Sequence, residues 1–214
     1  ALARGLAEGF EAIEAGLVAA QDFADSRKGR VVVACVPSLS GVRLPTILAS
    51  YRSKDVTTQI DIEELTYVEM VDALAARRVD FGIGPCVDPP PPTIAFTLAA
   101  DDPMCVLLPI RHQFASLDAA PLKLLADLTL IFLKGTAPLQ ASLREAAGVN
   151  GINLSSRTKV RQVHTAIGMV RAGVGAAIVP RLALPDKMDS DLVALPIIDP
   201  PMVRRTGILT SRGT

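Results

Sequence analysis

The feature that most constrains the fold is an alternation of apolar strands with amphipathic helices in the first part of the chain. Residues 31–36 form a continuous apolar run that Pro37 ends, as is typical of a strand buried on both faces. Residues 58–65 alternate apolar and polar side chains, as a half-buried strand does. Strands and helices are expected to alternate in the order 31–36, 42–52, 58–65, 68–76 and 80–84. This order predicts a parallel sheet with right-handed crossovers.

A second unit of the same kind follows the proline run at 89–92, which predicts a surface loop. Asp101, Asp102 and Pro103 interrupt an apolar stretch, so we expect these residues to form a turn at a hinge between two strands. The strands expected in this half are 93–99, 104–108, 129–133, 152–160, 176–179, 192–197 and 203–210. The helices expected in it are 122–126, 138–147 and 162–172.

Two α/β halves joined by strands near 98–102 and 197–201 predict a hinged pair of subdomains. Ligands of open α/β sheets bind beyond the carboxyl ends of the strands, which here is the cleft between the halves.

A polar turn is expected at 38–41, and Gly173 is a good left-handed cap for the helix before it.

The composition limits the classes of function. Half of the residues are hydrophobic and 21% are charged, which excludes a disordered chain. The 22 basic and 22 acidic residues give a formal net charge of zero. Domains that hold DNA by its phosphates carry a basic excess, so we do not expect this segment to bind nucleic acid by itself.

The cysteines and the apolar segments indicate a cytoplasmic protein. Cys35, Cys86 and Cys105 are odd in number, lie far apart and sit in or near apolar runs, which predicts buried thiols in a reducing compartment. No apolar stretch is long enough to span a bilayer, and the first residues lack the pattern of a signal peptide. We therefore expect a cytoplasmic location and no membrane partner.

The first 28 residues predict a helix that needs a partner. Apolar side chains recur at steps of three and four, at Leu2, Leu6, Phe10, Ile13, Leu17, Ala20 and Ala24. Packing of this stripe against a second copy of the chain would cover it. The alternative is a helix that folds back on its own domain.

Ordered sequence motifs from residue 29 to residue 210 resemble the regulatory domain of LysR-type transcriptional regulators. Each motif is weakly specific, but their order along the chain is specific. They are GRVVVACVPSLSGVRLPTIL at 29–48, IDIEEL at 60–65, DALAARRVDFGIG at 72–84, DPMCVLLPIRHQFA at 102–115, LADLTLIFLKGT at 125–136, MVRAGVGAAIVPRLA at 169–183 and LVALPIIDP at 192–200.

The resemblance implies an α/β fold of two Rossmann-like subdomains joined by two crossover strands, the architecture of type 2 periplasmic binding proteins. Residues 1–28 would be the linker helix that dimerises, 29–100 with 201–214 subdomain I, and 101–200 subdomain II. Family members begin with a winged helix-turn-helix domain that binds DNA and usually end in a further helix. Neither is visible in this sequence, so we expect DNA binding only through a domain absent from it.

By the same resemblance the chain would be an effector-binding and oligomerisation domain. It would sense a small anionic metabolite, most simply a carboxylate, and would need no cofactor. Dimers in the family pair head to tail, so the helix at 42–53 of one chain would meet the helix at 138–147 of the other, and the full-length protein could also form tetramers. A free-standing periplasmic-type solute-binding protein is the alternative. An enzyme on a similar fold is a third possibility, but the sequence offers no catalytic constellation.

The first half supplies candidate ligand-binding residues after two strands. Ser38, Leu39 and Ser40 follow the first strand and precede a helix, where hydroxyls and N–H groups favour an anion. In the family this loop supports the effector carboxylate. Ser40 can equally be only the N-cap of that helix. Thr66 and Tyr67 follow the second strand, and the register leaves both as candidates.

The second half supplies cationic candidates. Lys134, Gly135 and Thr136 lie at the carboxyl end of a strand, and Arg161 and Gln162 begin a helix at the opposite lip of the cleft. The two cations could neutralise a carboxylate, although most such side chains are solvated surface residues.

The remaining candidates are weaker. Arg43, near the first loop, is a further cation that could reach a ligand. His112 is expected to bond to neighbouring backbone, and His164 has no nucleophile or acid beside it in the sequence. The histidines and cysteines lack metal-ligand spacing, so no metal is expected. Gly173 and Gly175 follow a helix and precede a strand, the wrong order for a dinucleotide loop.

Overall fold

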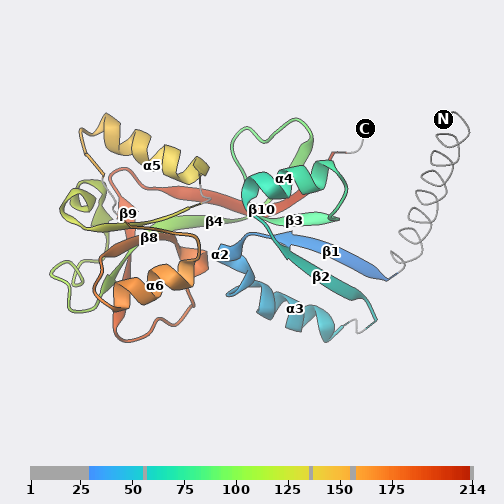
Figure 1. Cartoon of the computed structure of the whole chain (residues 1–214), viewed down its shortest axis with the longest axis horizontal. Coiled ribbons are helices and arrows are strands. Elements are labelled where there is room, and N and C mark those ends of the chain that lie inside the picture. Colours follow the sequence, from blue (N-terminus) through green and yellow to red (C-terminus); the bar gives the residue numbers. More distant parts are fainter. Residues whose placement is uncertain (1–28, 55–56, 135–136, 155–157, 213–214) are drawn as a thin grey trace, which may run out of the picture.

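The computed structural model describes residues 29–54, 57–134, 137–154 and 158–212 as two lobes (Figure 1). The predicted linker helix at 1–28 lies outside the described residues. The first lobe contains β1 (Arg30–Cys35), α2 (Pro37–Ser40), α3 (Leu44–Arg52), β2 (Gln59–Glu64), α4 (Tyr67–Ala75), β3 (Phe81–Pro85) and β10 (Val203–Ser211). The second contains β5 (Ala120–Pro121), η1 (Leu122–Asp127), β6 (Leu130–Leu133), α5 (Ala137–Val149), β7 (Thr158–Val160), α6 (Val163–Arg171), β8 (Ala176–Pro180), η2 (Arg181–Ala183) and β9 (Leu192–Ile198).

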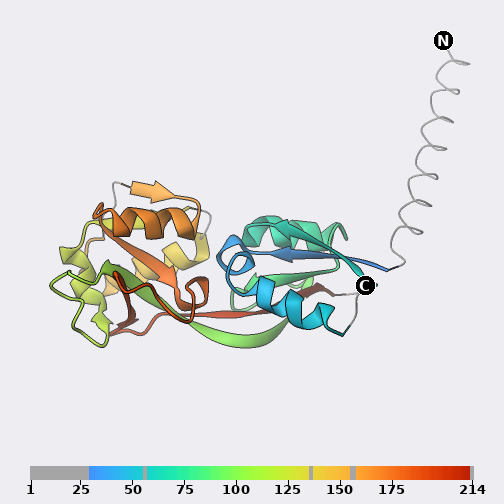
Figure 2. The same cartoon turned by 90° about the horizontal axis from the view of Figure 1, so that it is seen from below.

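The sheet of the first lobe has the predicted parallel pairing. Strand β1 lies between β2 and β3 and is parallel to both. The carboxyl ends of the three strands therefore meet at one edge, where Cys35 of β1 is the register partner of Glu64 of β2. This edge faces the second lobe, as Figure 2 shows. Segments that follow these strands are thus placed at the boundary between the lobes.

Strand β4 (Ile94–Pro109) is continuous, so the predicted turn at Asp101–Pro103 is wrong. Its first part pairs with β10, and its last part pairs with β8 and β9, so that it runs from one lobe into the other (Figure 2). Asp102 remains inside this strand because its fully buried carboxylate has partners. It accepts from Arg204 Nε at 2.7 Å and from the backbone N–H of Leu182 at 2.8 Å.

The second lobe has a core on each face of its sheet. Successive residues of β6 and β8 alternate between them, since Leu130 and Ile178 belong to one core and Ile131 and Val179 to the other. Helix α5 closes the first core with Leu143, and α6 closes the second with its own apolar face, through Ala166 and Val170. Successive side chains of a strand point to opposite faces of the sheet, so a core on each face buries both sets of side chains.

Three local predictions need correction. Residues 38–41 are not a simple turn, because Ser38 lies inside the short helix α2 and Ser40 ends it. Ser40 is not the N-cap of the next helix, because α3 begins at Leu44 with Arg43 as its N-cap. Of the strand expected at 152–160, the described residues form β7 (Thr158–Val160), whereas the N–H of Ile152 bonds to the end of α5. The left-handed cap at Gly173 is confirmed by its φ of +77°.

Thr66 begins α4 with a capping box. Its hydroxyl accepts from the Glu69 N–H at 3.4 Å, and the Glu69 carboxylate accepts from the Thr66 N–H at 2.8 Å. Because an N-cap hydroxyl satisfies an otherwise unpaired N–H, Thr66→Ala should lower the free energy of unfolding by about 1 kcal/mol in urea denaturation. The control is Thr165→Ala at an exposed position inside α6, which should not destabilise the protein.

The capping box also makes the stability of the protein depend on pH. The bond from the Thr66 N–H lowers the pKa of Glu69 below its ordinary value. A lowered folded-state pKa stabilises the protein above the unfolded pKa of about 4.3, and this stabilisation is lost as the pH falls through the folded value. The stability difference between the wild type and Glu69→Gln should therefore shrink below pH ~4. An unchanged difference at low pH would contradict this account of the cap.

Candidate functional site

A cavity of about 590 Å³ lies between the lobes, at the carboxyl ends of β1, β2 and β3. Six of the predicted ligand-binding residues line it and come from both lobes. They are Ser38, Thr66, Tyr67, Lys134, Arg161 and Gln162.

The other predicted ligand-binding residues are placed differently. Leu39 is 3% exposed and packs in the core of the first lobe. The Ser40 hydroxyl is bonded to the carbonyl of Pro37 and to Glu64, and neither Leu39 nor Ser40 lines the cavity. Gly135 and Thr136 lie outside the described residues. The fold therefore brings together the hydroxyl residues after β1 and β2 and the cations after β6 and β7.

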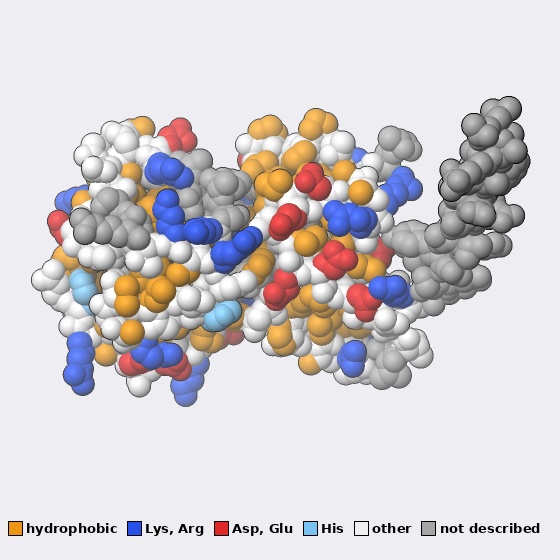
Figure 3. All heavy atoms as spheres, viewed as in Figure 1, with side chains coloured by type: hydrophobic (Ala, Val, Ile, Leu, Met, Phe, Trp, Pro, Cys, Tyr) orange, Lys and Arg blue, Asp and Glu red, His pale blue; other side chains and the backbone are white. Residues whose placement is uncertain are grey.

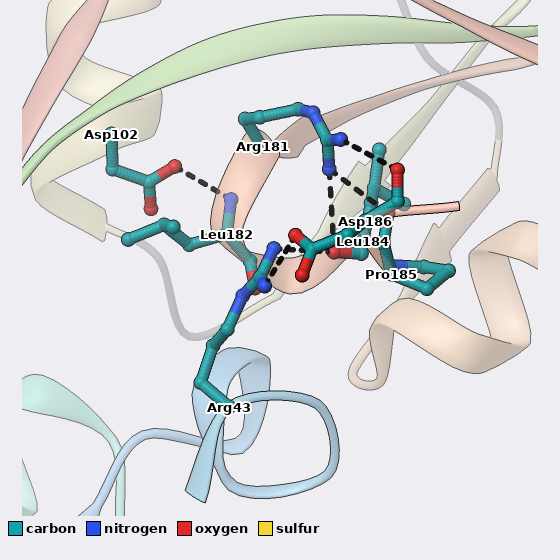
Figure 4. Close-up of polar contacts among 7 residues, drawn as sticks. All are labelled: Arg43, Asp102, Arg181, Leu182, Leu184, Pro185 and Asp186. Carbon is teal, nitrogen blue, oxygen red and sulfur yellow. Dashed lines mark hydrogen bonds and ion pairs between the residues drawn. The ribbon is translucent and has the colours of Figure 1, made fainter. Parts of the chain in front are cut away.

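Arg43 does not line the cavity but joins the two lobes (Figure 4). From the first lobe its guanidinium donates to the carbonyls of Leu182 at 3.1 Å and Leu184 at 2.9 Å, and it forms an ion pair with Asp186 at 2.6 Å. The Leu182 side chain also packs against the core of the first lobe. Arg181 binds the carbonyls of Leu184 and of the two residues after it, which shapes the loop that Arg43 holds.

Arg43→Ala should lower the free energy of unfolding by about 1–3 kcal/mol, because carbonyls that now accept from a charged donor lose it. It should also speed amide hydrogen exchange in residues 181–186, which Arg43 holds against the first lobe. Arg171→Ala is the matched control. It removes exposed ion pairs with Asp189 and Asp191 and should cost no more than about 1 kcal/mol. Equal losses for both variants would contradict a joining role for Arg43.

Sequence reasoning missed Arg204, which lines the cavity from β10. Its side chain is only 10% exposed, with Nε bonded to Asp102 at 2.7 Å and Nη2 to the Ser38 hydroxyl at 3.1 Å. Two acidic residues at 101–102 and two arginines at 204–205 both lie near the predicted hinge. Their opposite charges were the sequence signal that could have indicated an ion pair. In the structure Asp102 and Arg204 are register partners.

The acidic residues of the cavity wall all belong to the first lobe. They are Glu64, Glu69 and Asp88, and β10 of the same lobe adds Arg204 and Arg205, while Lys134 and Arg161 line the cavity from the second lobe. On the face shown in Figure 3, acidic side chains likewise gather on the first lobe and a row of basic side chains crosses the second toward the boundary. An anionic group would therefore be repelled by the acidic part of the first lobe and attracted toward Lys134 and Arg161 of the second lobe and toward the arginines of β10.

A tyrosine and a cysteine form a less polar part of the cavity wall. The Tyr67 hydroxyl oxygen is buried beside the Cys86 thiol, and burial raises the pKa of Tyr67 to about 12. The expectation of buried cysteines is confirmed for Cys35 and Cys105, where burial raises the pKa of the thiols to about 12 and about 11. It is wrong for Cys86, which is half-buried on the cavity wall.

The histidines take no part in the cavity. His112 accepts from the Phe114 N–H at 3.2 Å, which confirms its predicted structural role, and His164 is exposed on α6. Within the described parts of the chain, no group of three His, Cys, Asp or Glu side chains could hold a metal ion. In the same parts, no helix is long and apolar enough to cross a membrane.

The chain resembles known transcriptional regulators in sequence. The family model described as the LysR substrate binding domain matches residues 24–214. The uncharacterised HTH-type transcriptional regulator YbhD of Escherichia coli K12 is 22% identical over 189 residues, which cover 88% of this chain and 59% of YbhD. The chain thus spans about half to three fifths of the length of the curated relatives it matches.

Solved structures share the fold. The regulatory domain of CcmR from Synechocystis PCC6803, in complex with 2-PG, matches with a TM-score of 0.76 at 17% identity, covering 87% of this chain and 89% of that one. The effector binding domain of BenM with its effector benzoate matches with a TM-score of 0.73 at 22% identity, covering 87% and 85%. The chain therefore belongs to the LysR substrate-binding domain family and has the type 2 periplasmic-binding-like fold of LysR effector-binding domains.

Proposed function

We propose that this chain senses a small anionic metabolite, most simply a carboxylate, in the cavity between its lobes. The observation that carries the proposal is the composition of the cavity wall. Ser38 and Thr66, which carry hydroxyl groups, line the cavity from one lobe, and the cations Lys134 and Arg161 line it from the other. Gln162 adds an amide. A ligand that contacts both walls stabilises one angle between the lobes, which is how such a site couples binding to a change of shape.

The solved neighbours support this choice of ligand class. The BenM domain holds benzoate and the CcmR domain holds 2-PG. We further infer that subdomain I comprises 29–100 with 201–214 and subdomain II comprises 101–200, because β4 passes between the lobes near residue 103 and the chain returns before β10.

A thermal-shift screen of the purified chain tests the proposal. The probes are benzoate, 2-PG, aliphatic carboxylates, amino acids and sugar phosphates. A ligand present at 100 times its Kd should stabilise the fold by about 2.7 kcal/mol. Ser38→Ala should reduce the stabilisation by that ligand. The control is Ser50→Ala, which changes an exposed serine on α3 and should leave the stabilisation unchanged. Stabilisation by no probe, or a response indifferent to Ser38, would contradict this cavity as the sensing site.

We also infer that the chain forms homodimers in which α3 of one copy meets α5 of the other. Exposed apolar side chains on α3 support this, since Ile47 is 52% and Tyr51 39% exposed, and Val149 at the end of α5 is 83% exposed. Ile47→Glu should shift sedimentation toward the monomer, whereas Thr46→Glu, a control on the same helix, should not. An unchanged dimer in Ile47→Glu would contradict this interface.

We propose that the full-length protein is a cytoplasmic regulator that binds DNA through a winged helix-turn-helix domain outside these 214 residues. Its relatives support this, because they carry the names of HTH-type regulators and are longer than this chain. The same names speak against the alternatives of a free-standing periplasmic solute-binding protein and of an enzyme.

A further inference from the structure

Arg204 is the most buried cation of the cavity wall. Lys134 and Arg161 are exposed, whereas the side chain of Arg204 is 10% exposed and extends from β10, the strand of the first lobe that pairs with β4. An exposed cation gains little from binding an anion, because water already solvates it. A buried guanidinium gains more, because the same interaction is stronger where water is excluded.

The guanidinium is held in place by partners that leave one edge unused. Asp102 accepts from Nε and Ser38 accepts from Nη2. Among the described residues, Nη1 has no hydrogen-bond partner. Asp102 is itself fixed, because it is fully buried and also accepts from the Leu182 N–H at 2.8 Å. Arg204 is therefore preorganised and need not be ordered by the ligand.

The partners do not fully compensate the buried charge. Burial lowers the pKa of Arg204, and this effect outweighs the opposing effect of Asp102. The cationic form is thus less favourable in this site than in water, and an additional anion beside the guanidinium would offset the difference.

We propose that Arg204 is the anion receptor of the cavity and determines its preference for ligands with a carboxylate or phosphate group, an inference that rests on the proposed sensing function. The ligand anion accepts from Nη1, and the Ser38 hydroxyl, already bonded to Nη2, lies within reach of the same anion. Asp102 is the positioning residue that holds the guanidinium from behind. Lys134 and Arg161 then attract the anion toward the cavity without fixing its position.

The test compares anions with neutral molecules of the same shape. Acetate and benzoate are titrated against acetamide and benzamide, with inorganic phosphate as a third anion, at constant ionic strength. The midpoint of thermal unfolding gives an apparent Kd for each probe. The variants are Arg204→Lys and Arg204→Gln, and the control is Arg30→Gln, which removes an arginine from an exposed ion pair with Asp61.

We expect the wild type and Arg30→Gln to bind at least one anion and to prefer it over its amide. Arg204→Gln should bind that anion at least tenfold more weakly, and Arg204→Lys should lie between them, since Lys keeps the charge but loses the planar donor geometry. Because Arg204→Gln leaves Asp102 buried without its partner, the double variant Arg204→Gln, Asp102→Asn is measured as well, with no unpaired charge remaining.

The outcomes separate this inference from the proposed function. If Arg204→Gln or the double variant binds the anion as tightly as the wild type, the role of Arg204 is overturned while the sensing cavity stands. Binding of the amides but of no anion by the wild type would also overturn the role of Arg204. A wild type that responds to none of the probes contradicts both proposals.

Discussion

Asp102→Ala is expected to lower the free energy of unfolding by about 3–5 kcal/mol. Asp102 is fully buried in the middle of β4, and its carboxylate satisfies both Arg204 and the Leu182 N–H. Alanine leaves a guanidinium in a desolvated site without its anion and a backbone N–H without its acceptor. The cost is therefore that of an uncompensated buried charge, which exceeds the value of the lost bonds.

Urea denaturation of the chain measures this effect, and Asp101→Ala is the matched control. Asp101 precedes Asp102 on the same strand but is exposed, so its replacement should change the stability by no more than about 0.5 kcal/mol. A loss below about 1 kcal/mol for Asp102→Ala would show that water reaches Arg204 and that the pair is not a buried one.

Gly207→Ala should be destabilising by about 3 kcal/mol or more, although it adds a single methyl group. Gly207 lies on β10 where the ladder with β4 shifts register. A Cβ at this position would lie 2.0 Å from the carbonyl oxygen of Thr97 and 2.9 Å from the Phe96 ring. The neighbouring atom is backbone, so it cannot move away without breaking the pairing of β4 with β10.

The control for this prediction has the opposite sign. Gly168 lies inside α6, and a Cβ there would meet no atom within 4 Å. Gly168→Ala should therefore stabilise the protein by roughly 0.5–1 kcal/mol, since alanine favours a helix more than glycine does. In thermal and urea unfolding, Gly207→Ala should lower the free energy of unfolding relative to the wild type, and Gly168→Ala should raise it. If both stabilise the chain, the close approach of β10 to β4 is not present in solution.

Most of the fold follows from local patterns in the sequence. Strands β1, β2 and β3 and helices α3 and α4 were predictable, because apolar spacing over a few residues reports which face of an element is buried. The continuity of β4 was not predictable in this way. Asp102 has the composition of a turn, and its partner Arg204 is 102 residues away in the chain, so local spacing contains no sign of their pairing.

The candidate site was predictable to a similar extent. The rule that ligands bind beyond strand ends led to Ser38, Thr66, Lys134 and Arg161, because each follows a strand. Ser40 does not line the cavity, and at the end of helix α2 its hydroxyl bonds to Glu64. Arg204 was missed because it lies within a strand at the hinge, where the rule for strand ends does not apply.

The position of β10 has a consequence for the order in which a newly made chain can fold. β10 follows the strands of the second lobe in the sequence, yet it lies between β3 and β4 in the sheet of the first lobe. The second lobe, by contrast, draws its strands from the continuous stretch between Met104 and Ile198. During synthesis the second lobe can therefore complete its sheet while the first still has a gap beside β3. The amino-terminal part of this protein should be the later one to become resistant to proteolysis on the ribosome.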